Sequence, residues 1–219
     1  MREDVCIVIP AYNPDDKLST LINALKDYNI LVVNDGSSNS FDFTIPGIIL
    51  LEHKWNKGKG EALKTAFKYI KEQTDYTFVV TADADGQHTS EDIKRVIEEL
   101  KENRFVLGCR KFDKNTPLRS YIGNKITSVI LKLFYNINIS DSQTGLRGFS
   151  VNILKELINI QGSRYEYETA VLLKLKELNL KIVELPICTI YCDNNCCSHF
   201  NPFKDSAKIF FQIFWRKLC

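Results

Sequence analysis

The first half of this chain alternates short apolar runs with segments of helical periodicity, and this alternation constrains the fold more than any other feature. The apolar runs lie at 5–10, 30–33, 48–51, 78–82 and 105–109. After the first run, apolar residues recur with helical spacing at Leu18, Leu21, Ile22 and Leu25. Short continuous apolar runs separated by helices are typical of strands buried on both faces of a parallel sheet. We therefore predict an α/β fold with a mostly parallel central sheet and helices on both faces.

Capping residues predict where the helices begin. Asn13 as N-cap and Pro14 as the first helical residue would start the first helix. Ser90 would cap the helix after the fourth strand, with its apolar residues on one face. The remaining elements are expected at 61–72 (helix), 116–136 (a long amphipathic helix), 151–158 and 167–178 (helices), 181–186 (strand) and from 202 onwards (a last helix).

Composition indicates an ordinary globular chain. With 219 residues, 44% of them hydrophobic and 26% charged, one domain over 1–219 is expected. The net charge of +2 points to no nucleic-acid partner. The start of the chain does not resemble a signal peptide, and no run approaches the roughly 18 apolar residues of a membrane span. The seven cysteines then predict reduced thiols in a cytoplasmic protein.

Two carboxylates follow the fourth apolar run, in the stretch TFVVTADADGQH. Asp83 and Asp85 come directly after the run, and Gly86 opens a turn. Where a strand breaks into a turn, acids at i and i+2 can converge on one hard cation. The carboxyl end of a buried strand is also where α/β sheets bind ligands. The alternative is that Asp-Ala-Asp-Gly is only a strand-ending turn, because Asp and Gly are common turn formers.

Polar residues also follow the second and third strands. Asp35 lies in the segment NDGSS after the second strand, and Gly58-Lys59-Gly60 leads into the next helix. The Gly-Lys-Gly segment does not meet the GxxxxGK[ST] spacing of a P-loop, so a Walker site is not expected.

Five motifs in order resemble the family 2 glycosyltransferases of GT-A fold, and most closely the dolichyl- or polyprenyl-phosphate sugar (mannosyl or glucosyl) synthases. The matching segments are 9–13 (IPAYN), 33–37 (VNDGS), 56–60 with Ala62 (NKGKG and A), 83–87 (DADGQ) and 143–147 (QTGLR). The resemblance covers roughly the whole chain, and five ordered motifs are far more specific than one. One departure is that the first motif in this family often continues with Glu, whereas Pro14 and Asp15 follow here.

The resemblance implies a Rossmann-like nucleotide-sugar-binding half over 1–110. Asp35 would accept hydrogen bonds from the base, and Lys59, in a flexible Gly-Lys-Gly loop, would lie near the nucleotide. The implied donor-binding residues are Pro10, Tyr12, Asn13, Asp35, Gly58, Lys59 and Asp83. The implied ligands of a Mg²⁺ or Mn²⁺ ion bridging the diphosphate are Asp83, Asp85 and Gln87. Oxygen ligands suit these cations, which would neutralise the leaving nucleoside diphosphate.

The acceptor-side half is expected over 111–200. The residues expected to act in catalysis are Asp83, Asp85, Arg110, Arg119 and Arg147. Guanidinium groups bind phosphate in a bidentate manner, so the three arginines suit a phosphate acceptor, whose oxygen is already anionic. A hydroxyl acceptor would instead need a base, for which the candidates are Asp141, Glu166 and Glu168. The last two would equally suit a charge cluster at a helix N-terminus.

Two features in the part of the chain from Cys188 onwards each allow two interpretations. The soft-ligand cluster of Cys188, Cys192, Cys196, Cys197 and His199 lacks the paired CxxC spacing of zinc sites, so free thiols are expected. By resemblance, the loop at 191–203 would close near the acceptor, where His199 could contact a phosphate. The amphipathic helix over 201–219 has basic residues beside its apolar ones and would either rest on a membrane surface or pack on the core.

Together these features predict an inverting glycosyltransferase. It would move a hexose from a nucleoside diphosphate sugar to a polyprenyl phosphate with a divalent cation. It would be cytoplasmic, with peripheral contact at the cytosolic face of a membrane. Two alternatives are transfer to a glycan hydroxyl and a non-catalytic nucleotide-sugar-binding module. The base and the sugar of the donor stay open.

Overall fold

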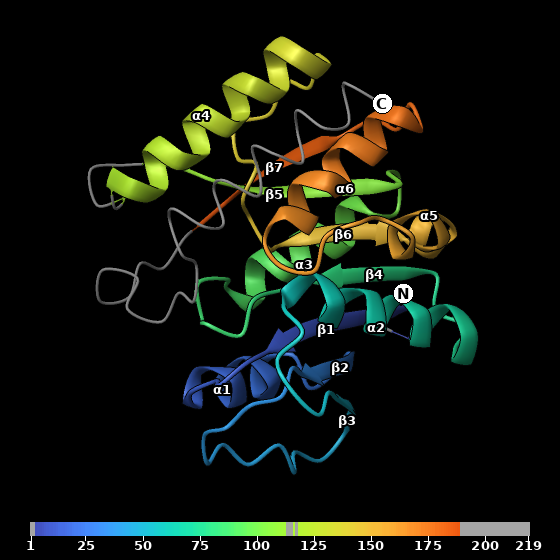
Figure 1. Ribbon diagram of the computed structural model, residues 1–219. Helices are drawn as coiled ribbons and strands as arrows, with labels where there is room; N and C mark the ends of the chain where they lie inside the picture. Colours follow the sequence, from blue (N-terminus) through green and yellow to red (C-terminus); the bar gives the residue numbers. More distant parts are fainter. Residues whose placement is uncertain (1–2, 113–115, 117, 189–219) are drawn as a thin grey trace.

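A seven-stranded sheet organises the part of the chain that the computed structural model describes, residues 3–112, 116 and 118–188 (Figure 1). Its strands are β1 (Val5–Ala11), β2 (Asn29–Asn34), β3 (Ile48–Glu52), β4 (Phe78–Thr81), β5 (Phe105–Arg110), β6 (Arg147–Ser150) and β7 (Val183–Ile187). The strand order is β3-β2-β1-β4-β6-β5-β7. All pairs are parallel except the two that involve β6. The predicted α/β class with a mostly parallel sheet is confirmed.

Strand β6 is absent from the sequence prediction. Its sequence, RGFS, contains no β-branched residue and only one large apolar side chain, so it gives no strand signal. The strand lies antiparallel between β4 and β5, and Arg147 is paired with Thr81 at the carboxyl end of β4. Because β6 begins where β4 ends, the loop before β6 lies beside the segment that carries Asp83 and Asp85.

Helices cover both faces of the sheet, as predicted. The helical elements are α1 (Asp16–Ala24), α2 (Lys59–Gln73), α3 (Ser90–Glu99), α4 (Leu118–Tyr135), a 3-10 turn at Val151–Ile153, α5 (Leu154–Ile158) and α6 (Glu166–Glu177). Helices α1 and α3 share one apolar core with one face of the sheet. Helices α2, α5 and α6 form the other core, to which α4 contributes Leu131. Helix α4 lies beside the β5–β7 end of the sheet (Figure 1).

Two predicted helix starts are wrong, by two residues in α1 and by one residue in α3. Helix α1 begins at Asp16, and Asp15 is its N-cap, accepting a hydrogen bond from the backbone N–H of Lys17. Asn13 instead adopts a positive φ of 48°, and its side-chain oxygen accepts hydrogen bonds from residues in the loop after β2. Helix α3 is capped by Thr89 and not by Ser90. In both places a neighbouring side chain with the same capping chemistry is better placed.

Helix α2 begins at Lys59, so this residue does not lie in a flexible loop as predicted. Gly58, just before it, has a φ of 103°, and a Cβ there would lie 2.4 Å from the carbonyl oxygen of Ser163. A Cβ on Gly60 would lie 2.7 Å from the Cβ of Tyr167. The two glycines therefore allow the start of α2 to pack directly against the start of α6.

Several predictions fall outside the described residues. These are the loop at 191–203, the four soft ligands after Cys188 and the helix over 201–219. Cys188 itself is described and exposed, and its thiol is free, as are those of Cys6 and Cys109. The division into donor-side and acceptor-side halves stays a prediction.

Candidate active site

Asp83 and Asp85 lie directly after β4, at the carboxyl edge of the sheet. Gly86 has a φ of 74° and turns the chain, and the backbone N–H of Gln87 donates to Asp85 Oδ1 over 3.0 Å. Burial and the neighbouring Asp83 carboxylate raise the pKa of Asp85. The two carboxylates are therefore close enough to repel each other, and a bound cation would relieve this repulsion.

The ammonium of Lys59 reaches this edge from the first residue of α2. Its Nζ lies 2.6 Å from Asp83 Oδ1 and 2.9 Å from Glu168 Oε1 on α6. Burial alone would lower the pKa of Lys59, but the two carboxylates outweigh it and raise that pKa. Burial alone would likewise raise the pKa of Asp83, but the charge of Lys59 and the contact with His88 hold it well below its usual range. Lys59 thus carries a positive charge and Asp83 a negative one.

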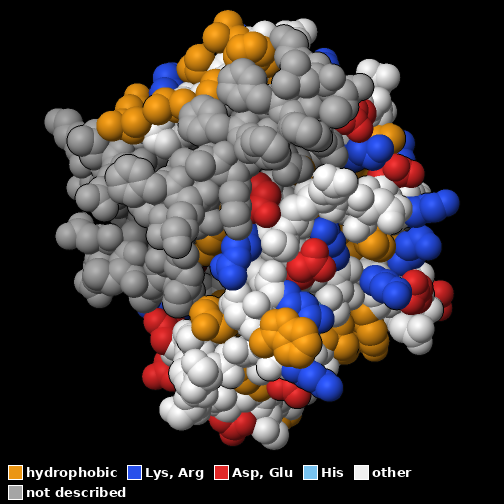
Figure 2. Space-filling model, viewed as in Figure 1, with side chains coloured by type: hydrophobic (Ala, Val, Ile, Leu, Met, Phe, Trp, Pro, Cys, Tyr) orange, Lys and Arg blue, Asp and Glu red, His pale blue; other side chains and the backbone are white. Residues whose placement is uncertain are grey.

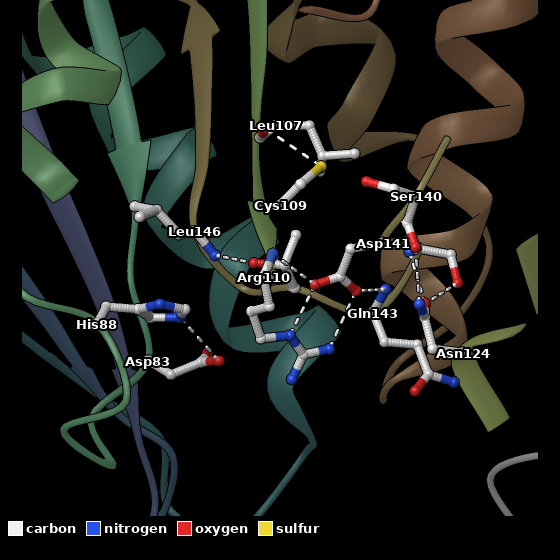
Figure 3. A network of polar contacts seen from close by, with 12 residues as sticks. Asp83, His88, Leu107, Cys109, Arg110, Asn124, Ser140, Asp141, Gln143 and Leu146 are labelled. Atoms are coloured by element: carbon white, nitrogen blue, oxygen red, sulfur yellow. Dashed lines mark hydrogen bonds and ion pairs between the residues drawn. The ribbon is translucent and has the colours of Figure 1, made fainter. Parts of the chain in front are cut away.

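His88 and Gly145 pack against the same carboxylate. His88 is buried, and its Nε2 lies 3.5 Å from Asp83 Oδ2 (Figure 3). Within the described part of the chain, neither ring nitrogen of His88 has a hydrogen-bond partner. A Cβ on Gly145 would lie only 2.2 Å from Asp83 Oδ2, so any other residue there would displace the Asp83 carboxylate. Gly145 belongs to the fifth sequence motif, but no sequence signal places it against Asp83.

Arg110 forms a bidentate ion pair with Asp141. Its Nε donates to Oδ2 over 2.6 Å and its Nη2 donates to Oδ1 over 3.0 Å (Figure 3). Asp141 is fully buried and also accepts the backbone N–H groups of Arg110 and Gln143. These bonds fix the end of β5 to the loop at 140–146.

Asn124 connects the same loop to α4. Its amide nitrogen donates to the carbonyl oxygen of Ser140, and its side-chain oxygen accepts from the backbone N–H and the hydroxyl of Ser142 (Figure 3). A lone asparagine within an amphipathic helix gives no sequence signal for this role. Through these hydrogen bonds, α4 helps to position the loop at 140–146 at the site.

Comparison with known proteins identifies the family. The model of the family described as "Glycosyl transferase family 2" matches residues 6–158. The chain belongs to this family. It is a glycosyltransferase. A UDP-N-acetylglucosamine–dolichyl-phosphate N-acetylglucosaminyltransferase from Methanococcus voltae is 33% identical over 98% of this chain and 94% of its own length. An undecaprenyl-phosphate mannosyltransferase from Micrococcus luteus is 25% identical over 84% and 82%.

A solved structure shows that the fold is shared. Glucosyl-3-phosphoglycerate synthase from Mycobacterium tuberculosis, crystallised with Mn²⁺, UDP and phosphoglyceric acid, has a TM-score of 0.74. It is 15% identical and covers 98% of this chain and 78% of its own. The resemblance to GT-A glycosyltransferases predicted from the sequence motifs is confirmed.

Arg147 was predicted to act at an acceptor phosphate, and this role stays a prediction because its side chain lies inside the protein in this structure. Its guanidinium is buried and donates to three backbone carbonyl oxygens, those of Thr144, Glu168 and Ser142, at 2.9, 2.6 and 3.2 Å. The side chain therefore connects the loop before β6 to α6 inside the protein. The backbone of Arg119 is in α4, and its side chain lies outside the described residues.

Asp35 was predicted to accept hydrogen bonds from the base of the donor, but both of its carboxylate oxygens have partners inside the protein. Asp35 is buried, its Oδ1 contacts His53 Nδ1 at 2.6 Å and accepts the N–H of Lys57, and its Oδ2 accepts the N–H of Gly58. Asp35 thus fixes the loop before α2 to the end of β2. The other donor-side candidates, Pro10, Tyr12 and Asn13, lie at and just after the end of the adjacent strand β1.

The candidate bases all have structural partners. Asp141 is paired with Arg110, and Glu168 with Lys59. Glu166 Oε1 accepts the backbone N–H groups of Ser163 and Arg164 in the turn before α6. These bonds fit the alternative of a charge cluster at a helix start, and Oε2 of Glu166 has no hydrogen-bond partner among the described residues, so its role as a base stays a prediction.

Proposed function

We propose that this glycosyltransferase transfers a hexose, with inversion, from a nucleoside diphosphate sugar to the phosphate of a polyprenyl phosphate. The names of both curated relatives contain a polyprenyl phosphate, dolichyl in one and undecaprenyl in the other. These relatives support the acceptor class. The inverting course and the use of a metal are argued from the site, and the hexose is carried over from the resemblance of the sequence motifs.

The observation that carries the proposal is that two of the three candidate bases, Asp141 and Glu168, are each paired with a cation. A hydroxyl acceptor must lose a proton as it attacks, which requires a free carboxylate or imidazole near the acceptor. The third candidate, Glu166, accepts two backbone N–H groups at Oε1, while its Oε2 is buried without a hydrogen-bond partner among the described residues. A phosphate monoester brings an oxygen that is already anionic. Its attack on the anomeric carbon from the side opposite the diphosphate would invert the configuration without a protein base.

The donor would lie over the carboxyl edge of the sheet, between β1, β2 and β4. Asp83 and Asp85 offer the oxygen ligands of a Mg²⁺ or Mn²⁺ ion, and the raised pKa of Asp85 marks a charge pair that a cation stabilises. The related M. tuberculosis structure was crystallised with Mn²⁺ and UDP. A bound ion would neutralise charge on the leaving diphosphate. Lys59 would supply a second positive charge beside it, and Arg110 stays the candidate for contact with the acceptor phosphate.

An acceptor comparison tests the proposed function. Purified protein is given a panel of UDP- and GDP-sugars with Mn²⁺, and either a polyprenyl phosphate or the matching polyprenol. Transfer is expected to the phosphate alone, with the opposite anomeric configuration to the donor, as followed by NMR. Transfer to the polyprenol or to a glycan, lost in Glu166→Gln, would contradict the proposal. Donor binding without any turnover would instead support a non-catalytic module.

An apolar surface on α4 suggests how a lipid acceptor is reached. Four side chains with helical spacing are 43–74% exposed and form what we call the α4 stripe, Ile122, Ile126, Val129 and Leu133. Hydrophobic side chains gather over α4 in Figure 2. The helix contains no acidic residue, while Lys125 and Lys132 are exposed. None of the helices in the described part of the chain is long and apolar enough to span a bilayer. We propose that the α4 stripe rests on an anionic membrane surface.

The double variant Ile126→Glu with Leu133→Glu tests this contact. Its binding to vesicles with anionic lipid is expected to weaken about tenfold or more, because two apolar side chains leave the interface and two negative charges are added. Co-sedimentation measures the effect, with transfer to a water-soluble short-chain polyprenyl phosphate expected to stay unchanged. The control adds the same two charges at Asn23 and Ala24, which are exposed on α1. Equal vesicle binding by all three proteins would refute the role of the α4 stripe.

A further inference from the structure

A buried ammonium occupies one side of the carboxylate that the metal is proposed to bind. Lys59 Nζ lies 2.6 Å from Asp83 Oδ1 and 2.9 Å from Glu168 Oε1. The side chains of Lys59 and Glu168 are only 17% and 7% exposed, so solvent screens this pair of contacts weakly. In the structure, Lys59 thus provides the positive charge that Asp83 requires.

The backbone around Lys59 holds the ammonium in this place. The glycines on either side of it, Gly58 and Gly60, pack against Ser163 and Tyr167, and the backbone N–H of Glu61 donates to the carbonyl oxygen of Ser163. Glu168 belongs to the same packed unit, on α6. Rotation of the Lys59 side chain is therefore the simplest way for its ammonium to leave Asp83.

Asp83 has little freedom to turn to another partner. Gly145 packs against its carboxylate, and His88 Nε2 lies 3.5 Å from its second oxygen. A divalent cation on Asp83 would lie next to the ammonium of Lys59, and like charges repel strongly where little water screens them. Among the described residues, no group of three or more His, Cys, Asp or Glu side chains is arranged to hold a metal.

We propose that Lys59 is an internal counter-cation that competes with the divalent cation for Asp83 and is retained at the site by Glu168. This inference rests on the proposed metal-dependent donor binding. When a donor binds, its diphosphate offers the ammonium another anion, and Asp83 becomes available to the metal. Metal and nucleotide then bind cooperatively, and by linkage each raises the affinity of the other by the same factor.

Binding of Mn²⁺ without nucleotide tests the competition. Free Mn²⁺ is measured by its electron paramagnetic resonance signal in titrations of the full chain, Lys59→Met and the control Lys68→Met. Lys68 is exposed on the same helix, so the control loses the same charge away from the site. Lys59→Met is expected to bind Mn²⁺ about tenfold more tightly than the wild type, with the control unchanged. UDP is expected to raise the Mn²⁺ affinity of the wild type at least about fivefold, and that of Lys59→Met much less.

A second variant covers the case in which Lys59→Met does not fold. Lys59→Met with Glu168→Gln also removes the buried carboxylate that would otherwise lose its partner, and it is expected to show the same gain in Mn²⁺ affinity. Unchanged or weaker Mn²⁺ binding in a folded variant would overturn the inference, as would no Mn²⁺ binding by any protein. Sugar transfer and UDP binding by the wild type, measured on the same preparation, report separately on the proposed function.

Discussion

Asp85→Asn is expected to lower kcat about 10²–10³-fold and to make the metal-free protein more stable at neutral pH. The activity falls because the variant lacks a proposed ligand of the cation on the leaving diphosphate, whose charge stabilisation amounts to about 3–4 kcal/mol. The stability rises because the Asp85 carboxylate is partly buried beside Asp83, and both features disfavour its charged form. Asparagine keeps the shape of the neutral acid without that charge.

The direction of the pKa shift fixes the pH dependence. Because the pKa of Asp85 is raised in the folded protein, the folded state holds this proton more tightly than the unfolded state does. The stabilisation of the folded state by this tighter proton binding is fully present below the ordinary Asp pKa of about 3.9. It is lost as the pH rises through the raised pKa of the folded protein. The gain in melting temperature of Asp85→Asn over the wild type should therefore grow from acidic to neutral pH. Thermal unfolding in a chelating buffer at several pH values measures it.

Asp83→Asn is the matched comparison. The same substitution two residues away removes a carboxylate whose pKa is lowered by the charge of Lys59, so its stabilising effect is present above the ordinary Asp pKa and is lost at acidic pH. Asp83→Asn should thus lose activity and be less stable at neutral pH, where Asp85→Asn loses activity and is more stable. If both variants shift the melting temperature in the same direction at neutral pH, the two carboxylates do not have the opposite environments described here.

The fold was predictable from sequence to the extent that each strand had a local signal. Continuous apolar runs located β1, β2, β3, β4 and β5, and helical spacing predicted helices on both faces. Strand β6 could not be found this way, since four residues with one large apolar side chain become a strand only through pairing with both β4 and β5. Helix starts were missed where two capping residues are adjacent, as at Thr89 and Ser90, because only the local backbone decides which side chain accepts the hydrogen bond.

The candidate site was predictable at the strand ends and less so elsewhere. Motif order led to Asp83, Asp85 and Lys59, which lie at one edge of the sheet. The sequence does not show which polar side chains are buried and form hydrogen bonds inside the protein. Asp35 and Arg147 belong to motifs and have the chemistry of ligand-binding groups, yet each is buried and bonded to the backbone. Asn124 and Gly145 act through contacts with residues at least 16 positions away in sequence.

Arg147→Met is expected to lower the free energy of unfolding by about 3–5 kcal/mol, and this loss would explain any loss of activity. The substitution leaves the carbonyl oxygens of Ser142, Thr144 and Glu168 without the buried donor that each has now. An unsatisfied buried polar group costs about 1–3 kcal/mol. Arg147→Lys should restore only part of the stability, because one ammonium cannot match the fork of three guanidinium nitrogens.

Urea denaturation of Arg147→Met, Arg147→Lys and Arg95→Met measures the effect. Arg95 donates both to Asp92 and to the carbonyl oxygen of Pro186, but its side chain is 49% exposed. Its loss should cost less than about 1 kcal/mol, because water can replace the donor. Wild-type stability of Arg147→Met, combined with a raised KM for the lipid phosphate, would return Arg147 to the acceptor site that its motif predicts. A large loss of stability with an unchanged KM in the folded fraction would instead show that the arginine holds the loop before β6 against α6.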